Sequence, residues 1–462
     1  MIRIFRHYLS SAYVWLFFTE FVVLYFSMYW GAELRFFYTN SWYSDEYILL
    51  SSAIFAVVIL ISNVGLGLYR RSLSWDDFHL LSRIGVSFTS ALLVLLVIYY
   101  SFPEFTMARS VLVYSFVMAL LGILFCRYIF YGYAKRSKLR KKILVIGVGD
   151  NASSLVSSNH EYIHRGFQVV ACLNLNNAPV KVKGYQVVSD YESILSVANN
   201  LDIDEIVMAL DDRRCEFPMD DLLDCKVEGI EVVDLLSFYE REKSMIDLNN
   251  IYPSWFVFSD GFSSSGFRNY SKRMVDILAS AALLLVSWPF MLIVACAIYI
   301  ESGFKGPILY RQTRVGAFDK DFDVIKFRSM RTDAELNGAQ WAQENDNRVT
   351  RVGGFIRKVR LDELPQIWNV FRGDMSFVGP RPERPKFVDQ FDKNIPYYRK
   401  RHRVKPGITG WAQLCYPYGA NEYDAIQKLQ YDLYYVKNYS LFLDLTIIIH
   451  TIEIILWGKG AR

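Results

Sequence analysis

Two adjacent carboxylates, Asp362 and Glu363, lie in the cation-rich stretch RKVRLDELPQIWNVFRG, which covers residues 357–373. The proline after the pair is typical of a first helical turn and the final glycine of a helix end, so the sequence predicts a short helix from Pro365 to Arg372. The acidic pair would then precede a helix N-terminus, where the helix dipole favours negative charge and anions. Taken alone, the stretch is more typical of an acidic helix cap among solvated cations.

Short motifs built from Arg, Lys, Gly and Pro fill the chain beyond Ile300. Cations on loops, with glycines that allow close backbone approach, suit a polyphosphate ligand. Arg381 stands between two prolines, and a stiff backbone favours a bidentate phosphate contact. The motif KPGITG, which begins at Lys405, predicts a turn whose amides could hold an anion or a base. Lys326 and Arg328 in IKFRSM are further candidates, although each could be an ordinary strand-surface charge.

The composition indicates a membrane component, because hydrophobic residues make up 52% of the 462 residues and aromatic residues 16%. The length suggests roughly two to four domains. A formal net charge of +4 gives no reason to expect nucleic acid as a partner. The six cysteines are scattered without a CxxC pair, so no zinc or redox motif is predicted and reduced, cytosolic thiols are the default.

Four apolar segments in residues 1–134 predict a four-span transmembrane bundle, since each is near the length that crosses about 30 Å of hydrocarbon. The segments are Tyr13–Trp30, Tyr47–Tyr69, Ile84–Phe102 and Ser110–Tyr131. Basic residues gather before the first segment, between the second and third, and after the fourth, in the run KRSKLRKK. The positive-inside rule therefore places both ends of the bundle in the cytoplasm.

Residues 135–260 alternate between strand and helix patterns, which predicts a Rossmann-like α/β module with a parallel sheet. The predicted strands are Lys142–Gly147, Phe167–Asn174, Asp204–Leu210 and Gly229–Leu235. Gly147, Gly149 and Ala152 fit the G-x-G-x-x-G/A turn of dinucleotide-binding folds. The second strand ends in CLNLNN, without the acidic residue that would hold a ribose hydroxyl. A regulatory or dimerising role is therefore favoured over a nucleotide site.

A Gly/Ser-rich linker, residues 261–270, precedes an apolar run that is interrupted at Pro289. The simplest interpretation of this run is a fifth transmembrane span. A crossing, however, would place the basic, globular remainder of the chain outside the cell, whereas a proline within the run kinks the helix. We therefore predict a re-entrant membrane helix at about residues 272–301, with its break at Ser287 and Pro289.

Residues 271–462 closely resemble the bacterial sugar transferases, the monotopic polyprenyl-phosphate phosphoglycosyl transferases. The resemblance rests on KR..D from Lys272, GP...RQ.R.G, KFRSM, LDELPQ, GDMSFVGPRP and KPGITGWAQ, which occur in matching order. The four spans and the α/β module resemble the larger members that start exopolysaccharide or O-antigen assembly. Many members have Ser directly before the helix-breaking Pro, whereas here Trp288 intervenes.

The resemblance implies a C-terminal α/β catalytic domain that transfers a sugar 1-phosphate from a UDP-sugar to polyprenyl (undecaprenyl) phosphate. Asp362 would be the nucleophile, kept ionised by its flanking cations, and Asp362 and Glu363 would hold Mg²⁺. The expected substrate contacts are Arg381 as the phosphate clamp, Lys326, Arg328, Arg357 and Lys405 as further cations, and Gly407, Thr409 and Gln413 at the nucleotide end. The expected location is the bacterial inner membrane, with the catalytic domain on the cytoplasmic side, in contact with membrane lipid and as a homodimer.

Two other functions are compatible with parts of the sequence. A nucleotide-sensing membrane scaffold with an inactive transferase tail would need an intact dinucleotide turn, yet that turn lacks its acidic partner while the tail keeps its acidic pair. A lipid carrier or flippase would need a series of charges within the spans, which the sequence does not show. Release of UMP from UDP-sugars distinguishes the transferase from both.

Overall fold

The computed structural model describes residues 2–4, 7–9, 11–39, 45–69, 78–103, 107–135, 140–161, 167–175, 178–211, 218–262, 266–332, 347–416 and 421–456. The chain forms two units, one of Met1–Ile2 with Tyr8–Glu242 and the other of Arg3–His7 with Lys243–Arg462. Two short strands, β1 (Ile2–Ile4) and β2 (His7–Leu9), pair near the N-terminus. Half of the basic run KRSKLRKK, residues 136–139, lies outside the described residues.

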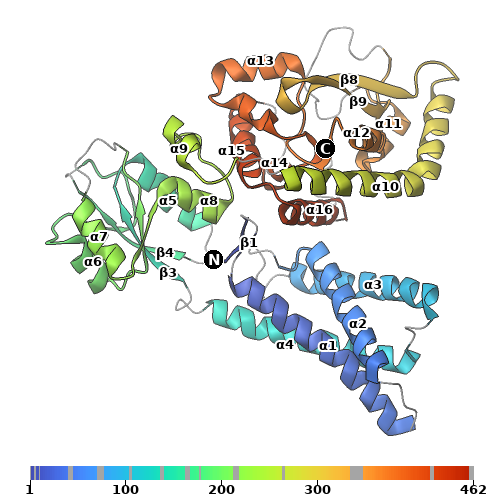
Figure 1. Cartoon of the computed structure of the whole chain (residues 1–462), viewed down its shortest axis with the longest axis horizontal. Helices are drawn as coiled ribbons and strands as arrows, with labels where there is room; N and C mark the ends of the chain where they lie inside the picture. The colour runs from blue at the N-terminus through green and yellow to red at the C-terminus, as the bar shows by residue number, and fades with distance from the viewer. Residues whose placement is uncertain are drawn as a thin grey trace. The chain divides into compact units, whose positions relative to one another are not determined.

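Four long apolar helices begin the first unit, as the sequence predicts (Figure 1). They are α1 (Ser11–Thr39), α2 (Asp45–Gly65), α3 (Phe78–Ser101) and α4 (Arg109–Lys135). Side chains such as Leu24, Phe55 and Leu80 are fully buried between the helices, whereas Ile61 and Val97 are exposed. Each helix is long and apolar enough to cross a membrane, and exposed apolar side chains on such helices suit contact with lipid.

A buried ion pair joins α1 to α4. This pair is not predicted from the sequence. The Arg127 Nε atom lies 2.8 Å from Glu20 Oε1, and both side chains are fully buried. Tyr69 donates a hydrogen bond of 2.5 Å to Glu20 Oε2, and Arg127 donates one of 2.7 Å to the Leu68 carbonyl. Because buried charges are stable only when paired and hydrogen-bonded, this network holds the two helices in one register.

A five-stranded parallel sheet follows in the same unit, in the order β5-β4-β3-β6-β7. Its strands are β3 (Lys141–Ile146), β4 (Phe167–Leu173), β5 (Gln186–Val188), β6 (Glu205–Met208) and β7 (Glu231–Asp234). Four of them are the predicted strands. Strand β5 cannot be predicted from the sequence, because its three partly exposed residues give no pattern of burial.

Helices cover both faces of this sheet (Figure 1). They are α5 (Asp150–Glu161), α6 (Ile194–Asn200), α7 (Met219–Val227) and α8 (Leu235–Lys243). Leu155 and Phe238, from α5 and α8, belong to the core on one face. Ile194 and Leu222, from α6 and α7, belong to the core on the other. Alternate strand residues are thereby buried on both sides, which explains the continuous apolar runs of β3 and β4.

The second unit carries the long apolar helix and a mixed α/β part with short sheets. Strands β8 and β9 are antiparallel, and strands β10 and β11 are parallel. The strands are β8 (Leu309–Val315), β9 (Asp321–Phe327), β10 (Ser376–Val378) and β11 (Gly407–Thr409). The helices are α9 (Pro253–Phe258), α10 (Gly266–Glu301), α11 (Arg351–Lys358), α12 (Gln366–Arg372), α13 (Pro385–Asn394), α14 (Trp411–Cys415), α15 (Glu422–Asn438) and α16 (Leu441–Leu456), with 3₁₀ turns η3 (Ala317–Asp319), η4 (Leu361–Glu363) and η5 (Tyr398–Arg403).

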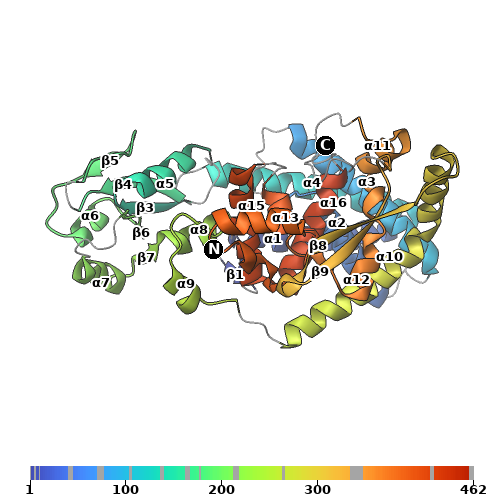
Figure 2. The same cartoon turned by 90° about the horizontal axis from the view of Figure 1, so that it is seen from above.

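Helix α10 contains Pro289 and bends partway along its length, as Figures 1 and 2 both show. Large apolar side chains on either side of Pro289, including Trp288 and Phe290, are exposed. The helix begins at Gly266, so residues 266–270 are helical rather than linker. The physical reason is local contact, since the Arg268 guanidinium lies 3.7 Å from the centre of the Tyr439 ring and would hold this end in place.

Candidate active site

The acidic pair lies on η4, a single 3₁₀ turn between α11 and α12. Arg360, directly before the turn, has the left-handed backbone conformation (φ 60°), which reverses the chain after α11. Pro365 caps α12 and Gly373 ends it with φ 102°. The predicted helix is thereby confirmed, and its N-terminus follows the acidic pair.

Asn369 fixes α12 against strand β9. Its side-chain amide donates to the Asp323 carbonyl at 2.8 Å, and its oxygen accepts from the Ile325 amide at 3.0 Å. Asn369 is fully buried, so both hydrogen bonds replace solvent that the side chain cannot reach. This connection sets the position of the next residue on β9, Lys326, relative to the acidic turn.

Glu363 is held by two cations. Arg381 Nη2 lies 2.9 Å from Glu363 Oε1, and Lys326 Nζ lies 3.5 Å from the same oxygen. Burial alone would raise the pKa of Glu363, but the charges of Arg381 and Lys326 outweigh it and lower the pKa to about 2. Glu363 is therefore ionised throughout the neutral range. Burial lowers the pKa of Lys326, while Glu363 opposes that shift.

Asp362 has a different environment from its neighbour. It is 8% exposed, and its Oδ1 is a buried oxygen without a hydrogen-bond partner among the described residues. Burial raises the pKa of Asp362, the charge of Glu363 raises it further, and Lys326 and Arg357 oppose the shift. The flanking cations therefore lower this pKa by less than burial and Glu363 together raise it, and the net shift is upward. A poorly solvated carboxylate oxygen is available for a cation or for reaction with an electrophile.

A buried ion pair holds the backbone of Arg381. Arg401 Nη2 donates to the Arg381 carbonyl at 2.9 Å and lies 2.7 Å from Asp432 Oδ2. Arg401 Nη1 donates to the Tyr398 hydroxyl at 2.7 Å. Arg401 and Asp432 are both buried. They come from η5 and α15, and neither stands out in the sequence.

The start of α10 contacts both α12 and β10, the two elements next to the acidic turn and Arg381. Arg273 Nη1 donates to the Val370 carbonyl at 2.7 Å, near the end of α12. Lys272 Nζ donates to the Val378 carbonyl at 3.1 Å, at the end of β10, and pairs with Asp444 at 2.6 Å. The acidic turn precedes α12 and Arg381 follows β10, so these contacts connect both to the apolar helix.

The glycines near Arg381 permit close packing of β10 and β11. Gly379 donates from its amide to the Thr409 carbonyl at 2.9 Å. A Cβ added at Gly379 would lie 2.2 Å from the Lys405 carbonyl oxygen, and one at Gly407 would lie 2.1 Å from the Gly379 nitrogen. The Thr409 hydroxyl lies 2.7 Å from that of Thr451. Gly407 and Thr409 thus have packing contacts that account for their residue types.

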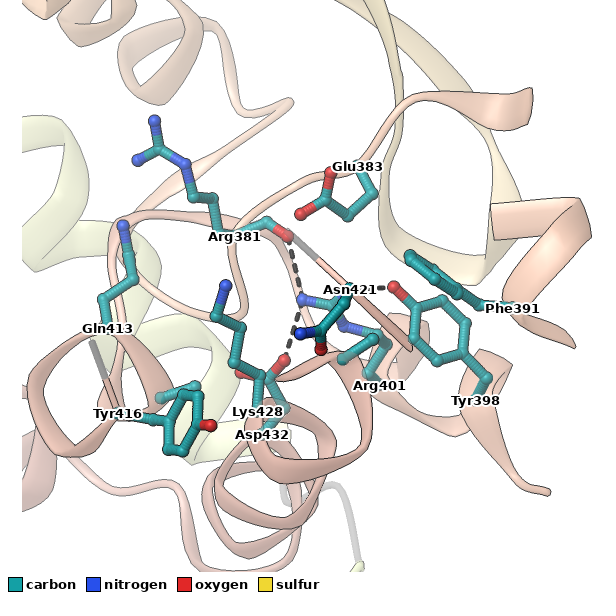
Figure 3. A pocket seen from close by; sticks show the side chains of 12 residues that line it. Arg381, Glu383, Phe391, Tyr398, Arg401, Gln413, Tyr416, Asn421, Lys428 and Asp432 are labelled. Carbon is teal, nitrogen blue, oxygen red and sulfur yellow. Dashed lines mark hydrogen bonds and ion pairs between the residues drawn. The ribbon is translucent and has the colours of Figure 1, made fainter. Parts of the chain in front are cut away.

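A pocket opens beside Arg381, with about 660 Å³ of space including its open mouth (Figure 3). Gln413, Lys428 and Asn421 line it together with Arg381. Figure 3 shows the polar ends of Gln413 and Lys428 pointing in the direction of Arg381. Of the three residues predicted for the nucleotide end, Gln413 therefore lines a pocket next to the predicted phosphate clamp.

The remaining predicted cations lie around this centre with different contacts. Arg357 is close enough for its charge to influence Asp362. Arg328 packs against Gly306, where an added Cβ would lie 2.4 Å from Arg328 Nη1. Burial lowers the pKa of Lys405, which is influenced by the charge of Arg273. The structure thus brings Asp362, Glu363, Lys326 and Arg381 together most directly.

The carboxylates could hold a divalent cation only together with a substrate. Within the described residues, no group of three or more His, Cys, Asp or Glu residues is arranged for a metal ion. The unpartnered Asp362 oxygen fits a cation, and Mg²⁺ commonly uses one or two carboxylates with substrate phosphates supplying further oxygens. Glu363 fits less well, because its Oε1 already faces Arg381 and Lys326.

Comparison with known families gives two matches. A family profile described as bacterial sugar transferase matches residues 267–458. A profile described as CoA-binding domain matches residues 65–216. A UDP-glucose:undecaprenyl-phosphate glucose-1-phosphate transferase of Caulobacter vibrioides is 40% identical over 192 residues, which are 41% of this chain and 71% of that relative. The chain belongs to the bacterial sugar transferase family. This confirms the resemblance inferred from the motifs.

Two further relatives show how far the similarity extends. A UDP-N-acetylgalactosamine-undecaprenyl-phosphate N-acetylgalactosaminephosphotransferase of Aeromonas hydrophila is 52% identical over 193 residues, which are 42% of this chain and 45% of that protein. An undecaprenyl-phosphate glucose phosphotransferase of Komagataeibacter xylinus is 31% identical over 357 residues, 75% of this chain and 65% of that protein. The chain thus spans about half to two thirds of the length of these two relatives. The acidic turn, Arg381 and the pocket all lie within the region that matches the bacterial sugar transferase profile.

Proposed function

We propose that this protein transfers a sugar 1-phosphate from a UDP-sugar to undecaprenyl phosphate, releasing UMP and starting the assembly of a polysaccharide such as an exopolysaccharide or O-antigen. One observation carries the proposal: Asp362 has a buried oxygen without a hydrogen-bond partner among the described residues, and the next residue, Glu363, is paired with Arg381 and Lys326. A nucleophile beside fixed cations suits attack on a diphosphate.

In the proposed reaction, Asp362 Oδ1 attacks the β-phosphorus of the UDP-sugar. The bond from that phosphorus to the bridging oxygen breaks, and UMP leaves with the electron pair. The phosphosugar remains as an acyl phosphate on Asp362. An oxygen of undecaprenyl phosphate then attacks the same phosphorus, which gives undecaprenyl diphosphate sugar and restores the carboxylate. Arg381 and Lys326 stabilise the charge on the transferred phosphoryl group.

Mg²⁺ is part of the proposal: Asp362 would be its main protein ligand, and Glu363, which already pairs with Arg381 and Lys326, would be a weaker one. The ion would neutralise charge on the diphosphate. The chain's own residues orient the reaction: Arg381 places the diphosphate, and Glu363 fixes the guanidinium of Arg381 through their contact of 2.9 Å.

The pocket beside Arg381 is the proposed place for the nucleoside, with Gln413 and Lys428 as contacts. We expect Lys428→Met to raise KM about tenfold for every UDP-sugar, because one charge-assisted contact is lost. Initial rates of UMP release against UDP-sugar concentration measure this. Lys393→Met, which alters an exposed lysine on α13, serves as the control. A change of sugar preference without a uniform rise in KM would instead place the sugar in this pocket.

N-acetylgalactosamine is the first candidate for the sugar. The relative named for that sugar is 52% identical over 193 residues, compared with 40% over 192 residues for the glucose-named relative of Caulobacter vibrioides. The deciding experiment incubates purified protein and undecaprenyl phosphate with UDP-GalNAc, UDP-GlcNAc, UDP-Gal or UDP-Glc and measures UMP. A nucleotide-sensing scaffold would release UMP from none of them.

The proposed arrangement in the bacterial inner membrane has residues 1–134 as a transmembrane bundle, 135–260 as a cytoplasmic Rossmann-like module and 271–462 as a cytoplasmic catalytic domain. The bend of α10, the proline within it (Pro289) and its exposed apolar side chains support a re-entrant helix. A homodimer, expected from the sequence analysis, belongs to the same proposal and can be tested by mass photometry of the purified protein.

The re-entrant helix predicts the side of the membrane on which Gly303 lies. In a variant whose six native cysteines are replaced by serine, a cysteine introduced by Gly303→Cys should react with an impermeant maleimide only after the cells are opened. Cysteines placed in the loops on either side of the second span provide the two reference patterns. Labelling of the Gly303 variant in intact cells would instead show that α10 crosses the membrane.

A further inference from the structure

The turn that joins β3 to α5 has the sequence GVGDNA, residues 147–152, and is called the glycine turn below. In dinucleotide-binding folds a turn of this kind presents backbone amides at a helix N-terminus to the phosphates of the ligand. The glycine turn of this protein has the expected place, directly after the central strand of the parallel sheet.

A carboxylate of the protein itself already occupies these amides. The amide of Asp150 donates to Asp211 Oδ2 at 2.8 Å, and the amide of Asn151 donates to Asp211 Oδ1 at 2.8 Å. Asp211 follows β6, which neighbours β3 in parallel, so both strands deliver their ends to the same edge of the sheet. Each oxygen of one carboxylate therefore accepts from one of two successive amides, as two oxygens of a phosphate would.

The space at the glycine turn is also filled. A Cβ added at Gly149 would lie 1.8 Å from Asp211 Oδ2, so only glycine admits the carboxylate at this distance. The amide of Lys181 donates to the Val148 carbonyl at 2.8 Å, and Lys181 Nζ pairs with Asp150 at 2.5 Å. The glycine that usually lets a pyrophosphate approach thus lets an aspartate approach instead.

We propose that Asp211 is the resident anion of the glycine turn, so that the module binds no dinucleotide or coenzyme phosphate there. A phosphate at this place would have to displace Asp211 and would meet the further negative charge of Asp150. Removing the Asp211 carboxylate should create a site for a free oxyanion, with inorganic phosphate as the simplest probe. This inference is independent of the transferase activity.

Hydrogen exchange of the full-length protein, followed by mass spectrometry of peptides that cover residues 147–155, tests the proposal. We expect Asp211→Ala to exchange the amides of Asp150 and Asn151 about tenfold faster than the unaltered protein, because both lose their acceptor. Phosphate should restore their protection, whereas chloride at equal ionic strength should not. The unaltered protein should show no change with phosphate, ADP, NAD⁺ or coenzyme A.

Asp204→Ala is the matched control, because Asp204 accepts from the Lys142 amide at 2.7 Å elsewhere in the module. It should leave the exchange of residues 147–155 unchanged and insensitive to phosphate. If Asp211→Ala unfolds the module, Asp211→Asn, which keeps one side-chain oxygen, allows the same comparison. Protection of these amides by coenzyme A, NAD⁺ or ADP in the unaltered protein would overturn the proposal, and so would an Asp211 variant without faster exchange.

Discussion

Asp362→Asn should abolish both UMP release and formation of the lipid-linked sugar, with a loss in turnover of about a thousandfold or more. The amide keeps the shape of the side chain but has no negative charge with which to attack phosphorus. The variant should remain folded, because burial and the neighbouring Glu363 both disfavour the charged form of Asp362 in the unaltered protein. The control is Asp389→Asn, which alters an exposed carboxylate that pairs with Arg399 on the surface.

The covalent intermediate can be separated from the second step by omitting the lipid. With UDP-sugar alone, the unaltered protein should release about one UMP per active site, and mass spectrometry should find a phosphosugar on the peptide that contains Asp362. Glu363→Gln should slow this burst without eliminating it, because Glu363 orients Arg381 rather than forming the bond. Near-normal turnover of the Asp362 variant would exclude the covalent scheme.

The sequence predicts the site best where one short stretch determines the structure. Pro365 and Gly373 bound α12 as expected, and the acidic pair stands before it because caps are local features. Lys326 and Arg381, identified through motifs, both contact Glu363. In the sheet module the apolar runs likewise specify four of the five strands.

Contacts between residues far apart in the chain could not be predicted from the sequence. Arg401 lies in a basic run where nothing distinguishes it from its neighbours, and its partner Asp432 is on another helix. Gly407 and Thr409 are predicted from their motif to contact a ligand, and in the structure Gly407 packs against Gly379 and Thr409 against Thr451. A glycine signals close approach in the sequence, but only the structure shows whether a ligand or another backbone approaches it. The same ambiguity applies to Gly149, which faces Asp211.

The second large effect is expected from the buried pair of Arg401 and Asp432. Arg401→Met should lower the free energy of unfolding of the catalytic unit by about 3–5 kcal/mol, because it leaves a buried carboxylate without its partner. Denaturant unfolding monitored by tryptophan fluorescence measures the change. Arg399→Met, which breaks exposed ion pairs of the same 3₁₀ turn, should cost less than about 1 kcal/mol.

The loss of stability caused by Arg401→Met should depend on pH in a defined direction. Burial raises the pKa of Asp432 to about 6 even with Arg401 present, and removing the cation can only raise it further. The folded state then binds a proton that the unfolded state, with a pKa of about 3.9, releases. Stability of the variant should therefore fall as the pH rises from about 4 through the raised pKa of Asp432, and the deficit should be smaller at pH 5 than at pH 8.

The double variant Arg401→Met/Asp432→Leu distinguishes the effect of the ion pair on stability from its effect on the active site. With both charges removed, most of the stability should return, since an apolar pair of similar size can replace a buried ion pair. Activity should not return to the same extent, because the carbonyl of Arg381 still lacks the donor that holds it at 2.9 Å. A raised KM for UDP-sugar in a stable double variant would show that Arg401 positions Arg381. Normal KM in that variant would limit the role of Arg401 to folding.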